Sequence, residues 1–135
     1  MTYRLSTDTR NKLANAIGND IDAGTGAGFI TIRTSTQPTN VGDSENGVLL
    51  GTLTFSDPSF GSASTGVITA NAITSDTSAD ASGTATHFRI FDSVSAIHSD
   101  GTCGLGSGDL SFDNNVIVAG GVIAISSMTI TVPIS

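Results

Sequence analysis

The sequence predicts a mainly β protein, an antiparallel β-sandwich of jelly-roll type with one N-terminal α-helix. Short runs of β-branched and aromatic residues recur along the chain, separated by Gly, Pro, Asn and Asp. This pattern is typical of strands joined by tight turns, and a long series of short strands indicates a sandwich or jelly roll. Charged residues make up only 13% of the 135 residues, while Ser and Thr are abundant. The sheets are therefore expected to be coated with hydroxyl groups rather than ions.

One helix is expected, at residues 5–23. Apolar side chains recur there with the spacing of a single helix face. This narrow stripe consists of Leu13, Ile17 and Ile21. The residues able to cap the first turn are Ser6, Thr7 and Asp8. Because the stripe is too narrow for a helix buried on all sides, it should lie against a sheet or against a neighbouring subunit.

The β-branched runs predict a series of short strands. They are expected at residues 29–34, 48–56, 66–74, 83–92, 94–98, 109–112, 116–118 and 122–132. The last of these, 122–132, should be the longest. Its apolar phase shifts by one residue at Ser126-Ser127, which predicts a β-bulge or a bend at that point.

The strand at residues 83–92 shows a clear alternation. Phe88 and Ile90 are expected to face the core, and His87 and Arg89 to face outward. The segments between strands are expected to be loops because they are polar or rich in glycine. These are residues 35–47, 75–82 and the irregular, glycine-rich 100–108.

The length predicts one domain, 1–135, in which residues 1–24 form an N-terminal arm and helix. The single cysteine, Cys103, excludes an intrachain disulfide and favours a reducing compartment. The first residues lack the apolar core of a secretory signal. No apolar run approaches the roughly 20 residues of a membrane span. We therefore expect a protein made in a cytoplasm.

The charge pattern argues against nucleic acid and membrane as partners. The formal net charge is −7, and the sequence pI is about 4.2. The few cations, Lys12, Arg4, Arg10, Arg33 and Arg89, are scattered, whereas binding to nucleic-acid phosphates needs a cluster. Anionic lipid would repel an acidic chain. A surface rich in Ser and Thr suits a protein partner, because burying hydroxyl groups costs less than burying Lys or Glu.

Two pairs of carboxylates are candidate metal ligands. These are Asp76 with Asp80, and Asp109 with Asp113. Neither stretch has the spaced oxygen ligands and turn glycine of a calcium loop. Loop carboxylates that bond to the nearby backbone are the favoured interpretation, so no metal and no cofactor is expected.

The remaining reactive side chains do not form a recognisable enzyme motif. His87 and His98 are the only histidines, and no nucleophile elbow accompanies them. Cys103 has no cation beside it in sequence, so an inert thiol is expected. Gly104-Leu-Gly-Ser-Gly108 lacks the lysine and the strand–helix setting of a phosphate loop. The sequence thus predicts that the protein is not an enzyme. The absence of Trp also argues against a sugar-binding site.

Several stretches together resemble a family of small structural proteins of tailed bacteriophages and prophages. Residues 53–61 read Leu-Thr-Phe-Ser-Asp-Pro-Ser-Phe-Gly, and residues 70–92 run from Ala-Asn-Ala-Ile-Thr-Ser-Asp to His-Phe-Arg-Ile-Phe-Asp. Residues 21–28, residues 36–38 and Gly120-Gly121 fit the same pattern, so the resemblance covers most of the chain. It carries no enzymatic motif and implies a virion component.

Within a virion, the expected function is that of a capsid cement, or decoration, protein. Its partners would be the major capsid protein and other copies of itself, in a contact without turnover. Alternatives are a tail, neck or spike-base protein of the virion, or a carbohydrate-binding module for attachment to a host. The N-terminal arm and helix are the expected docking element. The residues expected to make the contact are Tyr3, Leu5, Leu13, Ile17 and Ile21.

Overall fold

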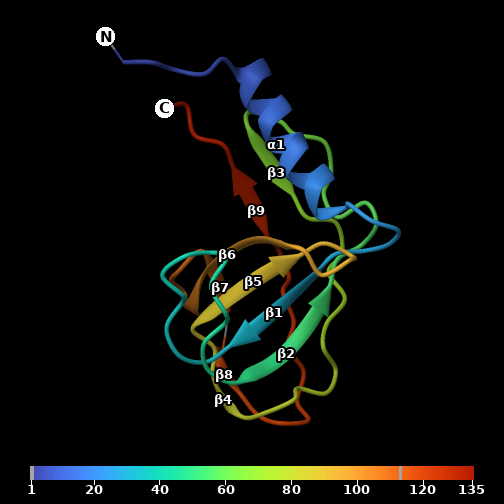
Figure 1. The fold of residues 1–135 in the computed structure, drawn as a ribbon, viewed down its shortest axis with the longest axis vertical. Helices are drawn as coiled ribbons and strands as arrows, with labels where there is room; N and C mark the ends of the chain where they lie inside the picture. Colours follow the sequence, from blue (N-terminus) through green and yellow to red (C-terminus); the bar gives the residue numbers. More distant parts are fainter. Residues whose placement is uncertain (1, 113) are drawn as a thin grey trace.

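The structure, a computed structural model, describes residues 2–112 and 114–135 of the chain. It contains one α-helix and nine strands in these residues (Figure 1). In chain order they are α1 (Thr7–Ile21), β1 (Phe29–Arg33), β2 (Leu49–Thr54), β3 (Val67–Thr69), β4 (Gly83–Thr84), β5 (His87–Phe91), β6 (Ile97–Leu105), β7 (Leu110–Phe112), β8 (Val116–Ile117) and β9 (Thr129–Thr131). The expected mainly β class with one N-terminal helix is confirmed.

Five strands form one curled sheet in the order β2-β1-β5-β6-β7. Its ladders are antiparallel except for the short parallel pairing of β6 with β7. Two further sheets have two strands each, β3-β9 and β4-β8. This arrangement is rich in antiparallel pairs, and it does not by itself establish a sandwich or a jelly roll.

The register of the central strands places apolar side chains in a row on one face of the sheet. Ile30 of β1 lies opposite Leu53 of β2 and Ile90 of β5, and all three are buried. They belong to a single core cluster that also includes Ile68 of β3 and Ile123 from the segment after β8. The core is thus shared between the sheet and the chain segments that pack on it.

Helix α1 begins where the sequence supplies a cap. The side chain of Ser6 accepts a hydrogen bond from the backbone N–H of Thr9 at 3.2 Å, which satisfies one of the free donors of the first turn. The helix buries Ala14, Gly18 and Ile21 and packs on β3. The buried face is therefore rotated away from Leu13, which is exposed, while Ile17 at its edge is half-buried and packs against the core.

The glycine-rich stretch and the last strand depart from the prediction. Strand β6 runs through Ile97–Leu105, so most of the expected irregular loop 100–108 is the longest strand. Gly101 lies opposite Phe88, and a Cβ at this position would lie 2.8 Å from the Phe88 ring. A glycine in this strand is thus required by the aromatic ring packed over it.

The expected long strand 122–132 is mostly not a strand. Only Thr129–Thr131 pairs as β9, and Ile123 makes a single bridge to Asp76. The chain bends at Ser126, as the phase shift predicts, and the bend redirects the chain toward β9. Similarly, the expected strand 83–92 is divided into β4 and β5.

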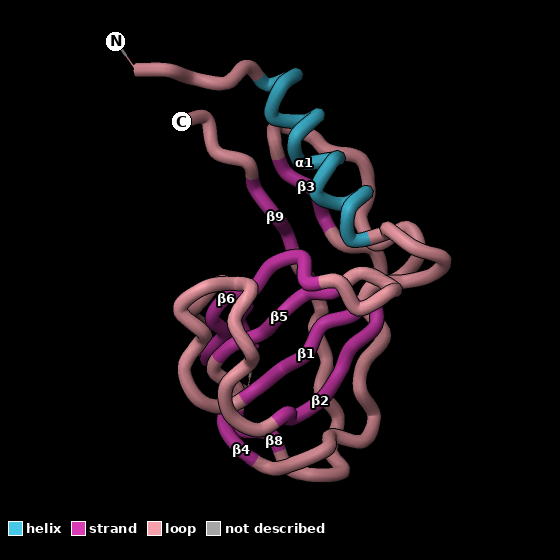
Figure 2. The backbone as a smooth tube through the Cα atoms, in the orientation of Figure 1, coloured by secondary structure: helices cyan, strands magenta, loops and turns pink. Residues whose placement is uncertain are grey.

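The chain is elongated, with two parts that Figure 1 and Figure 2 show end to end. We call the part built from α1, β3, β9 and the two terminal segments the projection, and the remainder, which holds the five-stranded sheet and β4-β8, the body. At the tip of the projection the two ends of the chain are hydrogen-bonded, Leu5 N donating to Ile134 O at 2.8 Å. Within the described residues, no helix is long and apolar enough to cross a membrane.

Candidate functional site

The polar side chains of the sheet meet a loop that covers its outer face. We call residues 34–47 the cover loop. The strand alternation predicts that Arg89 faces outward. Its side chain does lie on the outer face of the sheet, but it is only 2% exposed. Its guanidinium donates to Asp43 O at 2.7 Å and to Asp100 Oδ2 at 3.2 Å. Gln37 donates to the other oxygen of Asp100 at 2.6 Å, so both carboxylate oxygens are bonded.

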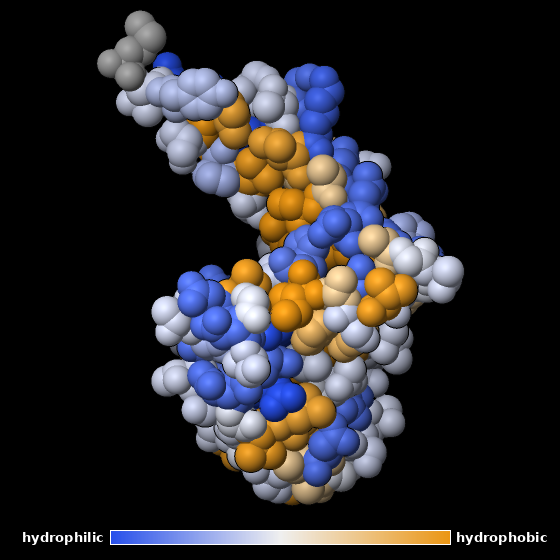
Figure 3. Space-filling model, in the orientation of Figure 1, coloured by the Kyte–Doolittle hydropathy of each residue, from blue (hydrophilic) through white to orange (hydrophobic). Residues whose placement is uncertain are grey.

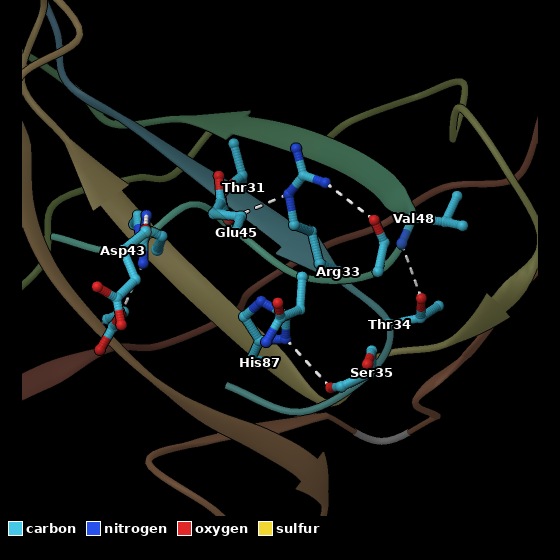
Figure 4. A network of polar contacts seen from close by, with 12 residues as sticks. Thr31, Arg33, Thr34, Ser35, Asp43, Glu45, Val48 and His87 are labelled. Atoms are coloured by element: carbon cyan, nitrogen blue, oxygen red, sulfur yellow. Dashed lines mark hydrogen bonds and ion pairs between the residues drawn. The ribbon is translucent and has the colours of Figure 1, made fainter. Parts of the chain in front are cut away.

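A second group of contacts ties the cover loop to the strands β1 and β5 (Figure 4). Glu45 accepts a hydrogen bond from the Thr31 hydroxyl at 2.9 Å and forms an ion pair with Arg33, whose Nε lies 3.1 Å away. That Nε makes no aligned hydrogen bond, so the contact is electrostatic. His87, expected to face solvent, is fully buried, and its Nδ1 lies 3.2 Å from Ser35 O.

The chemistry of this network is structural. Its arginines and carboxylates are paired with each other or with backbone carbonyls of the cover loop. Buried charges need such partners, because an unpaired charge away from water is costly. The network therefore holds the cover loop on the sheet, and the buried His87 and Arg89 are inaccessible to a substrate.

The second histidine, His98, is partly buried and has both a hydroxyl and a carboxylate near its ring. His98 Nδ1 lies 2.8 Å from Ser99 Oγ, and its Nε2 lies 3.6 Å from Asp20 Oδ2. The second distance exceeds hydrogen-bond range, and the Asp20 side chain is mostly exposed. A catalytic triad needs a carboxylate firmly bonded to the imidazole, so these contacts serve to bring α1 and β6 together.

The remaining carboxylates and the thiol have local roles. Asp76 accepts from the backbone N–H of Thr52 and of Ser78, each at 2.9 Å, and Asp109 accepts from Thr102 N at 2.9 Å. The expectation that these residues bond to the backbone is confirmed for both. No group of three or more potential metal ligands occurs in residues 2–112 and 114–135.

Asp80, the partner proposed for Asp76, is exposed, while Asp113, the partner proposed for Asp109, lies outside the described residues. Cys103 is buried, and burial raises the pKa of its thiol to about 11. Because the thiolate is the reactive form, this thiol is inert at neutral pH.

The residues expected to dock a partner are divided by the structure. Tyr3 is 82% exposed and Leu13 is 45% exposed, while Leu5 and Ile17 are half-buried. Ile21, the last residue of α1, is completely buried and belongs to the core cluster. Four of the five side chains thus lie at least partly at the surface of the projection, and the fifth, Ile21, packs in the core.

The exposed part of this stripe borders a shallow apolar hollow. The hollow has a volume of about 540 Å³ and is lined by Leu13, Ala16, Ile17, Asp20, His98 and Val132. Helix α1, Val132 just after β9 and the start of β6 each contribute to it. Figure 3 shows apolar side chains gathered along the same face of the projection. This hollow is the candidate docking site of the chain.

The non-helical side of this site is not predicted by the sequence. Val132 comes from the far end of the chain and is brought beside α1 by Arg10, whose Nε donates to Val132 O at 2.9 Å and whose Nη2 donates to Thr65 O at 2.8 Å. The only sequence signal is the apolar character of the last residues, which also fits an ordinary strand. Contacts so distant in sequence are not encoded in local periodicity.

Comparisons with protein families, with curated proteins and with solved structures found no match for this chain.

Proposed function

We propose that the chain is a non-enzymatic structural protein of a phage particle, a cement protein that binds the major capsid protein and other copies of itself. The observation that carries the docking is the apolar surface of the projection, with its hollow bounded by Leu13, Ile17 and Val132. Exposed apolar patches of this kind are typical of protein–protein contacts. The phage assignment rests on the resemblance of residues 53–61 and 70–92 to phage structural proteins.

In this proposal the protein acts as a clamp. The body is a preformed sheet held rigid by the cover-loop network, and the projection reaches away from it to a neighbouring subunit. A modest contact repeated over many symmetric copies gives a large total binding energy. We also propose that the curled sheet and the segments packed on it form a jelly-roll-like sandwich.

The copy number on purified particles tests the proposal. Particles from a host that expresses this gene are analysed by quantitative mass spectrometry against the major capsid protein. Hundreds of copies, in a constant ratio to the capsid protein, are expected of a cement protein. About a dozen copies or fewer would instead assign the chain to the tail, neck or spike base, and absence from particles would refute a virion role.

A variant tests the docking surface. Tyr3→Asp places a charge on the exposed tip of the projection without disturbing the core, since this side chain is 82% exposed. This variant should lower the fraction of added protein that co-sediments with particles from which the native protein has been removed. Val41→Asp, an exposed apolar residue of the cover loop, is the matched control and should bind like the unaltered chain.

A further inference from the structure

The cover loop ends in an asparagine followed by a glycine. Asn46-Gly47 is the only Asn-Gly pair in the sequence. Both residues are exposed and lie outside the helix and the strands, so water reaches the peptide bond between them. Asparagine is one of the chemically labile residues of proteins, because its side-chain amide can be lost without the help of an enzyme.

The backbone nitrogen of Gly47 is available for such a reaction. The carbonyl oxygen of this glycine accepts a hydrogen bond from Arg33 Nη1 at 3.3 Å, whereas its N–H has no hydrogen-bond partner within residues 2–112 and 114–135. An amide nitrogen attacks a carbonyl carbon after it loses its proton, and an unbonded amide in water exchanges that proton readily. Glycine also has no Cβ, so Gly47 offers no steric obstacle to ring closure with the Asn46 side chain.

The Asn46 side chain is held only weakly. Its Nδ2 donates to Thr36 O at 3.0 Å, in an exposed contact. A hydrogen bond of this kind contributes about 1 kcal/mol, so the side chain is released for an appreciable share of the time. When it is released, its carbonyl carbon Cγ is free to approach the nitrogen of the next residue.

We propose that Asn46 deamidates spontaneously and that this modification loosens the cover loop. Gly47 N loses its proton and bonds to Asn46 Cγ, the Cγ–Nδ2 bond breaks, and Nδ2 leaves with that proton as ammonia. The cyclic imide then takes up one water molecule. Opening of the ring at Cγ gives aspartate, and opening at the main-chain carbonyl carbon gives isoaspartate. The reaction needs only this chain and water, so it holds or fails independently of the proposed function.

Both products remove a contact of the cover loop. A carboxylate replaces the Nδ2 donor, and it repels Thr36 O instead of bonding to it. In isoaspartate the main chain also runs through the former side chain, which lengthens the loop just before Gly47. This glycine lies tightly against Thr34 O, and a Cβ on it would overlap that oxygen. The longer chain therefore cannot keep the native position of Gly47, and the loop should open more often.

Incubation of the purified full chain in a mildly alkaline buffer tests the reaction, because base generates the attacking nitrogen. Peptide mass spectrometry should show conversion of the Asn46 amide to a carboxyl group, in two products of equal mass that chromatography separates. The same chain unfolded in urea shows whether the folded loop prevents the reaction. If Asn46 reacts in urea and keeps its amide in the folded chain, the proposal is overturned.

Asn40 is the internal control in the same loop. It is exposed, and its Nδ2 is likewise held by a hydrogen bond, to Asp43 Oδ2 at 3.1 Å. The main difference is the next residue, Val41, whose branched side chain crowds the attacking nitrogen. Asn46 should react at least about tenfold faster than Asn40, which corresponds to about 1.4 kcal/mol in the activation barrier. Equal rates at both residues would overturn the role assigned to Gly47.

The variant Asn46→Gln should stay unmodified at this position, because its longer side chain would have to close a larger ring. Hydrogen exchange measures the loosening of the loop. The amides of residues 34–47 should exchange faster in the deamidated protein than in the fresh one, and Asn46→Asp should reproduce part of this increase. Ser44→Asp adds the same charge at an exposed position of the loop and should leave exchange unchanged. Equal exchange in the fresh and deamidated proteins would refute the loosening.

Discussion

Thr65 adopts a backbone conformation that β-branched residues rarely take. Its φ is 52° and that of Gly66 is 78°, and the flanking Ser64 and Val67 exchange two backbone hydrogen bonds of 2.9 Å. Two central residues with positive φ in a two-residue hairpin define a type I′ turn, for which Asn-Gly is the preferred sequence. Threonine is therefore a poor choice at the first central position.

The substitution Thr65→Asn should stabilise the protein by about 1 kcal/mol, because asparagine adopts the left-handed conformation more readily than a β-branched residue. Urea unfolding monitored by circular dichroism measures the difference. Thr65→Val serves as the comparison, since it keeps the branched shape and should not stabilise. A loss of stability in the asparagine variant would contradict this account of the turn.

His98 should make stability depend on pH. Burial lowers its pKa from the usual value of 6.5, and this outweighs the opposite influence of Asp20 and Asp92. The unfolded chain therefore takes up a proton at a higher pH than the folded chain does. The stabilising contribution is complete above pH 6.5 and is lost as the pH falls through the lower folded pKa.

The variant His98→Gln removes this titration and keeps a polar side chain. Urea unfolding of both proteins between pH 8 and pH 5 should show the unaltered chain losing more stability than the variant as the pH falls. The carboxylates that titrate at lower pH are common to both proteins and cancel in the comparison. Parallel curves would show that His98 does not carry the dependence.

At the scale of elements, the cover loop depends on a buried ion pair. Replacing Arg89 by Met keeps a long side chain but leaves Asp100 buried with Gln37 as its remaining partner. Breaking one side of a buried pair typically costs about 3–5 kcal/mol. Chemical unfolding should show this loss, and hydrogen exchange should accelerate in residues 34–47. The second substitution Asp100→Leu, added to Arg89→Met, should recover part of the stability because no unpaired charge remains.

A matched control for this prediction is Arg4→Met. Arg4 is exposed, so its loss should change the free energy of unfolding by less than about 0.5 kcal/mol. If the two arginine variants lose equal stability, the ion pair with Asp100 is not the cause.

The sequence predicts elements whose apolar pattern is local. Helix α1, β1, β2 and β7 lie where it places them, since each carries its own cap, alternation or turn. The prediction is wrong for β6, because its glycines suggest a loop. Gly101 is in fact a strand residue that must be small, because the ring of Phe88 on the neighbouring strand packs against it. It also fails for His87 and Arg89, because alternation indicates the face of a residue but not that a loop covers this face.

At the scale of the whole molecule, one side chain joins the parts of the projection. Arg10 on α1 donates to Val132 O after β9 and to Thr65 O in the turn before β3. Hydrogen bonds from a charged donor contribute about 1.5–3 kcal/mol each. The projection should therefore open as a unit when these bonds are lost, while the sheet of the body stays closed.

Hydrogen exchange of Arg10→Met tests this coupling. The amides of β3 and β9 should exchange at least about tenfold faster, because a loss of roughly 1.4 kcal/mol corresponds to tenfold in an opening constant. The amides of β1 and β5 should be unchanged. Lys12→Met, which removes only the exposed pair with Asp8, should leave both regions as they are. Uniform acceleration over the whole chain would mean that projection and body open together.

The hydrogen bond between Leu5 and Ile134 has a practical consequence for anyone who labels this chain. An affinity tag or fluorescent protein attached to either end would sit at the same tip of the projection, the part of the molecule that carries the proposed docking hollow. A label at Gly42 in the cover loop, where a Cβ would meet no atom within 4 Å, would lie on the body instead. Labels at that loop are therefore the suitable choice for measuring assembly, and cargo fused to an end would serve as a steric blocker of it.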